Sequence, residues 1–281
     1  MLILDPFHEY CGLMIPSEPQ VYANLSGASR VWAIGAIRGE ADRITALHNE
    51  LRGRIKIGDR VVYLGNYLGV GADVPRTIEE MLAFRRELLS RPGFCTAAIV
   101  YLRGAQEEMW RRFLELQFAP NPGEVLDWML GQGVAATLIG YGGDPEAARR
   151  ICREGAVGIT RFTSAVRSAI HTHPGHDELM ATLRRAAYTT EAELLFVAAG
   201  LDPSRPLSEQ GDTLWWGSGY FASINEPFSG FSRVVRGDDR RRQGPEMGAH
   251  TATLDGGCGY GGALHAACFT LDGRPIDWIQ V

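Results

Sequence analysis

The most constraining feature of the sequence is an alternation of short apolar segments with longer amphipathic ones in its first hundred residues. Val31–Ile34, Arg60–Leu64 and Thr96–Leu102 are short and rich in β-branched and apolar residues, which predicts strands. Ala41–Leu51 and Val74–Ser90 place apolar residues at helical spacing, which predicts helices. Strands that alternate with helices in this way predict an α/β fold.

The remainder of the chain divides into a helical block and a strand-rich block. Residues 105–190 are expected to be mainly helical, in the segments Gln106–Gln117, Val125–Gly131, Asp144–Glu154, Thr160–His171 and His176–Ala187. Glycine-rich turns then separate the expected strands Leu194–Ala198, Arg233–Val235, Thr251–Leu254 and Leu264–Leu271. Residues 1–30, which contain three prolines, predict an irregular N-terminal extension. Residues 31–281 are expected to form one domain.

Composition narrows the classes of function. The net charge of −5 over 281 residues speaks against a general nucleic-acid or anionic-membrane surface. The N-terminus lacks an apolar run of signal-peptide length, and the five cysteines form no CxxC pair. Both observations favour a cytoplasmic protein.

Five short, glycine-containing stretches follow the expected strands. They are Gly35–Gly39, Gly65–Gly71, Arg103–Glu107, Val197–Leu201 and Arg236–Asp238. In order and approximate spacing they resemble the GD-x-HG, GD-x-VDRG, RGNHE, HAG and HGH motifs of the phosphoprotein-phosphatase branch of the calcineurin-like metallophosphatases. The loops Leu201–Pro203 and Asp255–Gly262 also resemble loops of that family.

The resemblance covers roughly residues 31–271. It implies two facing mixed β-sheets flanked by helices. It also implies that residues 105–190 are a helical cap, like the one inserted in the bacterial branch of the family.

The residues that would hold two metal ions in the family are nevertheless replaced. Its six ligand positions correspond to Ala36, Arg38, Asn66, Ala105, Ala198 and Asp238. Alanine offers no donor atom, and arginine stays protonated and repels a cation. Only Asn66 and Asp238 keep a suitable oxygen, and two oxygens do not make a dinuclear site.

The acid–base groups of the family are replaced as well. Gln106 stands where the resemblance implies a proton-donating histidine, and glutamine does not titrate. Gly69 and Val70 stand where a supporting aspartate and a phosphate-binding arginine are implied. We therefore expect no catalytic residue, no bound metal and no cofactor at this position.

Two interpretations of the altered site remain open. Arg38, Arg103 and Arg236 are expected to converge there if the fold is kept, and a metal-free pocket of positive charge would suit phosphate. Alternatively, Arg38 pairs with Asp238 and fills the site, with Asn66 hydrogen-bonded nearby. The second arrangement is at least as favoured, because a buried arginine without a partner is costly.

These considerations predict an inactive phosphatase-fold protein, a pseudophosphatase, that serves as a binding or regulatory module. Its expected partners are a phosphoprotein or another signalling protein, or a ligand that carries phosphate. One alternative is an active serine/threonine-type or nucleotide phosphoesterase with a non-standard site. The other is a structural or oligomerising protein.

A separate histidine cluster lies in the helical block. His171, His173 and His176 form an H-x-H-x-x-H pattern around Pro174 and Gly175. A solvated loop between helices is the favoured interpretation, and a metal site is the less favoured one, because the loop offers no evident fourth ligand.

Overall fold

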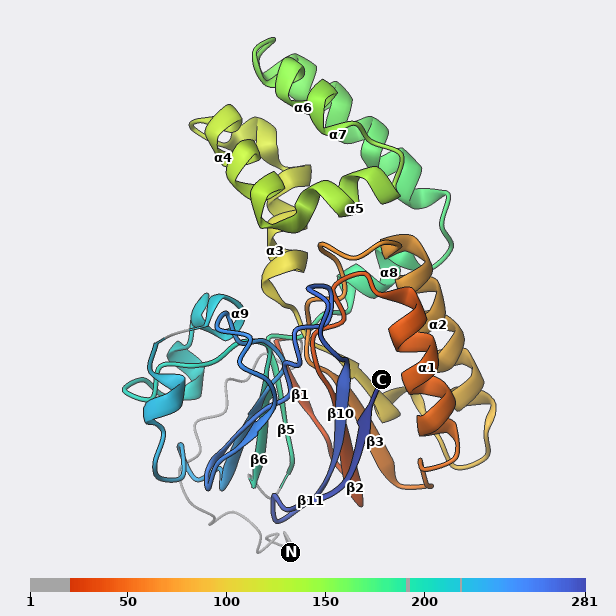
Figure 1. Ribbon diagram of the computed structural model, residues 1–281, viewed down its shortest axis with the longest axis vertical. Helices are drawn as coiled ribbons and strands as arrows, with labels where there is room; N and C mark the ends of the chain where they lie inside the picture. Colours follow the sequence, from red (N-terminus) through yellow and green to blue (C-terminus); the bar gives the residue numbers. More distant parts are fainter. Residues whose placement is uncertain (1–20, 191–192, 218) are drawn as a thin grey trace, which may run out of the picture.

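The computed structural model describes residues 21–190, 193–217 and 219–281. It contains two β-sheets that face one another, a pair of helices on the outside of one sheet, and a separate helical layer above the ends of the strands (Figure 1). No helix in the described ranges is long and apolar enough to cross a membrane.

The first sheet has five strands in the order β11-β10-β2-β3-β4. The strands β2 (Arg30–Ile34), β3 (Asp59–Tyr63) and β4 (Ile99–Tyr101) are parallel to one another. The strand β10 (His265–Thr270) is antiparallel to both of its neighbours, β2 and β11 (Pro275–Gln280). The outer face of this sheet is covered by α1 (Ala41–Arg52) and α2 (Val74–Ser90). Proline in the first turn of α2 and the Asp73 side chain, which accepts from the amide of Arg76, fix where that helix begins.

The second sheet has six strands in the order β1-β5-β6-β7-β9-β8 and is also mixed. These strands are β1 (Tyr22–Asn24), β5 (Ala186–Tyr188), β6 (Leu194–Val197), β7 (Arg233–Arg236), β8 (Glu246–Met247) and β9 (Thr251–Thr253). The pairs β1–β5, β6–β7 and β7–β9 are parallel, and β5–β6 and β8–β9 are antiparallel.

Apolar side chains from both sheets fill the space between them. Val31, Val62, Phe196 and Phe269 are fully buried there. The rings of Phe196 and Phe269, one from each sheet, lie 6.4 Å apart edge to face. This shared core fixes the two sheets against each other, and so it fixes the ends of their strands.

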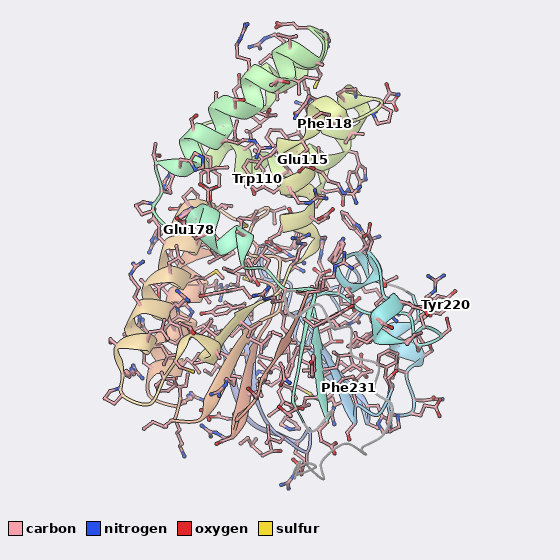
Figure 2. The ribbon with its side chains drawn as sticks, turned by 180° about the vertical axis from the view of Figure 1, so that it is seen from behind. Trp110, Glu115, Phe118, Glu178, Tyr220 and Phe231 are labelled. Carbon is pink, nitrogen blue, oxygen red and sulfur yellow. The ribbon has the colours of Figure 1, made fainter. Side chains whose placement is uncertain are left out.

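The helical layer is the cap. It consists of α3 (Ala105–Leu114), α4 (Pro122–Met129), a π-helical turn at Leu130–Val134, α5 (Ala135–Gly140), α6 (Pro145–Cys152), α7 (Ala156–His171) and α8 (His176–Ala181). Trp110 of α3 lies at the base of this layer (Figure 2), stacked at 5.0 Å on Phe113 and 5.8 Å from the ring of Tyr141. The aromatic contacts join α3 to the residue that follows α5.

Two differences between the observed elements and the sequence-based prediction concern the N-terminal extension and the end of the helical block. Residues 21–30 are not an irregular leader: β1 pairs with β5, and Leu25 is buried between the sheets. Residues 1–20 of the predicted extension lie outside the described residues. The helical block ends at Ala181, and the expected helix His176–Ala187 gives way to strand β5. Backbone pairing with neighbours distant in sequence decides both cases, and no local periodicity reveals it.

Candidate functional site

The loops that follow the parallel strands are hydrogen-bonded to one another, and this brings the matched motifs together. The amide of Ala36, after β2, donates to the carbonyl of Gly237 at 3.1 Å. The amides of Gly237 and Asp238, after β7, donate to the carbonyl of Ala198 at 3.0 and 2.8 Å. Three of the altered ligand positions, Ala36, Ala198 and Asp238, therefore lie side by side.

Asn66 joins this group through its backbone. Its carbonyl accepts from the amides of Ile37 and Arg38 at 3.1 and 2.7 Å, and its side-chain oxygen accepts from the amide of Gln106 at 3.0 Å. Both Asn66 and Arg38 adopt positive φ, at 56° and 54°, a strained conformation for residues other than glycine. Gly104 permits the close approach, because a Cβ there would come within 2.4 Å of the Asn66 nitrogen.

A buried carboxylate fixes the two central loops. Glu107, on the first turn of α3, accepts from the amides of Gly104, Asn66 and Tyr67, each at 2.8 Å, and of Leu68 at 3.1 Å. Burial raises the pKa of Glu107, and these four backbone hydrogen bonds oppose that effect. The glutamate that ends the Arg103–Glu107 motif thus has a structural role in holding the site.

Arg38 occupies the middle of the site. Its guanidinium donates to both carboxylate oxygens of Asp255, at 3.0 and 2.7 Å, and to the carbonyl of Cys258 at 2.9 Å. It also donates to Asp238. The Arg38 side chain is only 4% exposed, against 1% for Asp255 and 14% for Asp238. The predicted Arg38–Asp238 ion pair is confirmed, and Asp255 is a second partner that the sequence-based prediction missed.

The pKa values within this cluster reflect burial and charge pairing. Burial alone would lower the pKa of Arg38, but the bonds to Asp255 and Asp238 raise it, so the guanidinium stays charged. Burial alone would raise the pKa of Asp255, yet the bond and charge of Arg38 lower it. Burial prevails at Asp238, whose pKa is raised. Asp255 is therefore the stronger counter-ion.

The other two arginines behave differently. Arg236 lies close by, with its guanidinium 3.1 Å from Asp239, 2.9 Å from the Thr253 hydroxyl and over the ring of Phe221. Arg103 contacts other groups: its guanidinium lies 3.5 Å from Glu108 and over the Trp215 ring. Arg236 thus contacts the turn that holds Asp238 and Asp239, whereas Arg103 contacts Glu108 and Trp215. The convergence of these arginines on one anion pocket stays a prediction.

Gln106 ties the site to the cap. Its side-chain nitrogen donates to the carbonyl of Gln132 in the π-helical turn at 2.7 Å. Nearby, the amide of Gly69 donates to the hydroxyl of Thr137 in α5 at 3.2 Å. Ala105 begins α3 beside Gln106. Gln106, which matches the proton-donor position of the family, therefore holds α3 to the π-helical turn of the cap.

The residues present do not fit two divalent cations. Alanines stand at three of the six ligand positions, and the Asn66 side-chain oxygen is already bonded to a backbone amide. The remaining carboxylate at these positions, Asp238, is neutralised by the Arg38 guanidinium. A protonated arginine at the centre of the site repels a metal ion.

Asp255 is the residue of this cluster that the sequence-based prediction missed. It follows β9 in the loop Asp255–Gly262, which the sequence marked only as a family-like loop. Its carboxylate also accepts from the amides of Asp239 and Gly257, at 2.8 and 2.9 Å. The available signal was an aspartate directly after the expected strand Thr251–Leu254.

Comparisons with known proteins agree with this geometry at the level of the fold. A scan of protein-family models finds no match, and a search of curated protein sequences finds none either. Among solved structures, the chain is similar to a protein assigned as a diadenosine tetraphosphatase, at 18% identity over 93% of this chain and 98% of the other, with a TM-score of 0.55.

Two further solved structures share the architecture. A protein serine/threonine phosphatase from Saccharomyces cerevisiae matches at 13% identity, covering 93% of this chain and 82% of that one, with a TM-score of 0.53. A mutant of a cold-active protein tyrosine phosphatase matches at 12% identity, covering 93% and 84%, with a TM-score of 0.50. With its two mixed sheets flanked by helices, the chain has the calcineurin-like metallophosphatase fold.

Proposed function

We propose that this chain is a pseudophosphatase, a metallophosphatase-fold protein that binds partners and does not hydrolyse phosphoesters. One observation carries the proposal: the Arg38 guanidinium lies between the carboxylates of Asp238 and Asp255. The fixed positive charge of the guanidinium balances these carboxylates, as metal ions balance carboxylates in the family. It supplies neither a metal-bound water nor an open coordination position.

The same geometry argues against phosphate capture at Arg38. Both terminal nitrogens of its guanidinium are already bonded to two carboxylates and the carbonyl of Cys258. A phosphate at Arg38 would displace Asp238 and leave a carboxylate without its partner, which is costly in a buried site. A phosphorylated partner would meet Arg103 more easily, because its side chain is 29% exposed.

The cap supports recognition of a protein partner. Large apolar side chains are exposed on it: Phe118 at 80%, Trp128 at 50%, Ile139 at 59% and Val157 at 73%. Phe118 ends the short helical turn Leu116–Phe118 after α3 and is labelled within the cap in Figure 2. Exposed aromatic and aliphatic residues are typical anchors of protein interfaces. A phosphoprotein or another signalling protein is the partner class that we propose.

A thermal-shift experiment separates partner recognition from anion capture at Arg38. Inorganic phosphate should leave the melting temperature of the wild-type chain unchanged, because Arg38 is engaged. The Asp238→Ala variant should gain a saturable stabilisation by phosphate, because a ligand that binds only the native state raises stability. Saturable stabilisation of the wild type, lost in Arg38→Met, would establish an anion site and overturn this part of the proposal.

A further inference from the structure

The histidine cluster of the helical block meets a carboxylate from another part of the chain. His173 follows α7, His176 begins α8, and Glu79 lies on α2. Each offers one ligand atom, and these three atoms lie within 4.8 Å of one another. The His173 Nδ1 and the Glu79 Oε1 are 3.2 Å apart. Glu79 and His173 are partly exposed, at 55% and 30% of their side chains, so the cluster is open to solvent on one side.

His176 is the unusual member of the cluster. It is fully buried, in contrast to the solvated loop that the sequence favoured. Its Nδ1 lies 2.8 Å from the hydroxyl of Tyr141, and its Nε2 is buried with no hydrogen-bond partner among the described residues. An unpartnered buried nitrogen costs about 1–3 kcal/mol, and such groups are rare in native proteins. A ligand for Nε2 would remove that cost.

The chemistry of the donors selects the ligand. His176 meets the Tyr141 hydroxyl through its Nδ1. If its Nδ1–H donates to the Tyr141 oxygen, the Nε2 presents a lone pair. Orientation of a ligating histidine by a hydrogen bond at its other nitrogen is a common feature of metal sites.

The spacing also suits a transition metal. Zinc lies about 2.0–2.2 Å from histidine nitrogen and carboxylate oxygen, so neighbouring donors of a tetrahedral site are about 3.3 Å apart. The 3.2 Å between His173 and Glu79 matches this separation.

We infer that Glu79, His173 and His176 form a site for a divalent transition-metal ion of the zinc type. Two imidazoles and one carboxylate suit zinc better than magnesium, which prefers oxygen donors. Three protein ligands leave a fourth position for water or a partner's side chain. The site is separate from the Arg38 cluster and does not depend on the proposed function.

The proposed site lies between two parts of the domain, so a bound ion would connect them. Figure 1 shows α8 beside α2. Figure 2, the view from behind, shows the same neighbours, with α8 identified by the label of Glu178. α2 belongs to the layer on the first sheet, whereas His173 and His176 connect α7 of the cap to α8. A bound ion would therefore tie the cap to the body of the domain.

Titration of tag-free, chelator-treated protein with Zn²⁺ by calorimetry, with the melting temperature in parallel, tests the inference. The wild type should bind one ion per chain and melt at a higher temperature with it. His173→Ala and Glu79→Gln, both at partly exposed positions, should weaken binding by more than about tenfold. Tyr141→Phe should weaken it by about 10–100-fold, because the orienting hydrogen bond is lost.

His171→Ala is the matched control. His171 belongs to the same sequence pattern, but its ring contacts Asp177 and lies outside the cluster. This variant should bind Zn²⁺ like the wild type, and Mg²⁺ should not compete. No saturable Zn²⁺ binding by the wild type, or equal binding by the wild type, His173→Ala and Glu79→Gln, would overturn the inference.

Discussion

At the scale of single residues, the site is organised by one arginine and two aspartates that lie far from it in sequence. Arg38 is buried, and its charge is matched by Asp255 through two hydrogen bonds and by Asp238 through one. In a low-dielectric interior, removing one partner of such a group leaves an uncompensated charge. Loss of either carboxylate should therefore lower the stability of the fold, and loss of Asp255 should lower it more.

Asp255→Ala should lower the free energy of unfolding by about 3–5 kcal/mol, the cost of breaking a buried ion pair. Asp238→Ala should cost less, about 1.5–3 kcal/mol, because that side chain is partly exposed and makes a single bond to Arg38. Urea denaturation of both variants gives the comparison. An Asp255→Ala variant as stable as the wild type, or less affected than Asp238→Ala, would contradict this account.

Part of this cluster is predictable from the sequence. Arg38 and Asp238 stand at motif positions that face each other in the family, so their pairing follows once the motifs are matched. Asp255 is not at such a position, and the direction of its side chain depends on the turn after β9. Arg103 does match an arginine of the family motif, yet it lies over Trp215, a neighbour that sequence spacing does not identify.

At the scale of elements, predictability depends on whether local pattern or distant pairing decides the structure. The helix Val74–Ser90 is found with the bounds expected from the sequence, because its apolar stripe and its cap are local signals. The strands β1, β5, β8 and β11 were missed. β1 and β5 are three residues long, and β11 begins with proline and has one buried residue. Such short or edge strands form through partners that only the folded chain supplies.

A buried histidine at the contact between α1 and α2 predicts how the stability of the fold depends on pH. The buried His48 of α1 contacts Glu80 of α2 through its Nδ1 and the Tyr63 hydroxyl through its Nε2, both at 2.7 Å. Burial lowers the pKa of His48 below its ordinary 6.5. The unfolded chain then binds a proton that the folded chain resists, so the associated stability is present above pH 6.5 and is lost as the pH falls below it.

The free energy of unfolding, measured by urea denaturation across this range, should therefore decrease as the pH falls below 6.5. His48→Gln should be less stable at neutral pH and show a shallower slope, because glutamine does not titrate. The exposed His171→Gln serves as the control and should keep the wild-type slope. An unchanged slope in His48→Gln would show that other groups cause the acid sensitivity.

At the scale of the whole molecule, the chain has a metallophosphatase fold in which the altered site is hydrogen-bonded to the helical cap. Arg38 fills the site from within, and Gln106 and Gly69 bond to the cap above it. If the site is inactive, as we propose, restoring a working centre should require many changes together, because catalytic groups act as a unit. The positions concerned are Ala36, Arg38, Asn66, Ala105, Gln106, Ala198 and Asp238. Ala36→Asp alone should leave the protein inactive.

Turnover of an aryl phosphate in the presence of Mn²⁺ tests the central claim most directly. We predict that neither the wild type nor Ala36→Asp hydrolyses it above the rate without protein. His173→Ala is assayed in parallel, so that a metal ion bound by the histidine cluster is not mistaken for a catalytic one. Manganese-dependent turnover by the wild type that is abolished by a chelator and persists in His173→Ala would contradict the account.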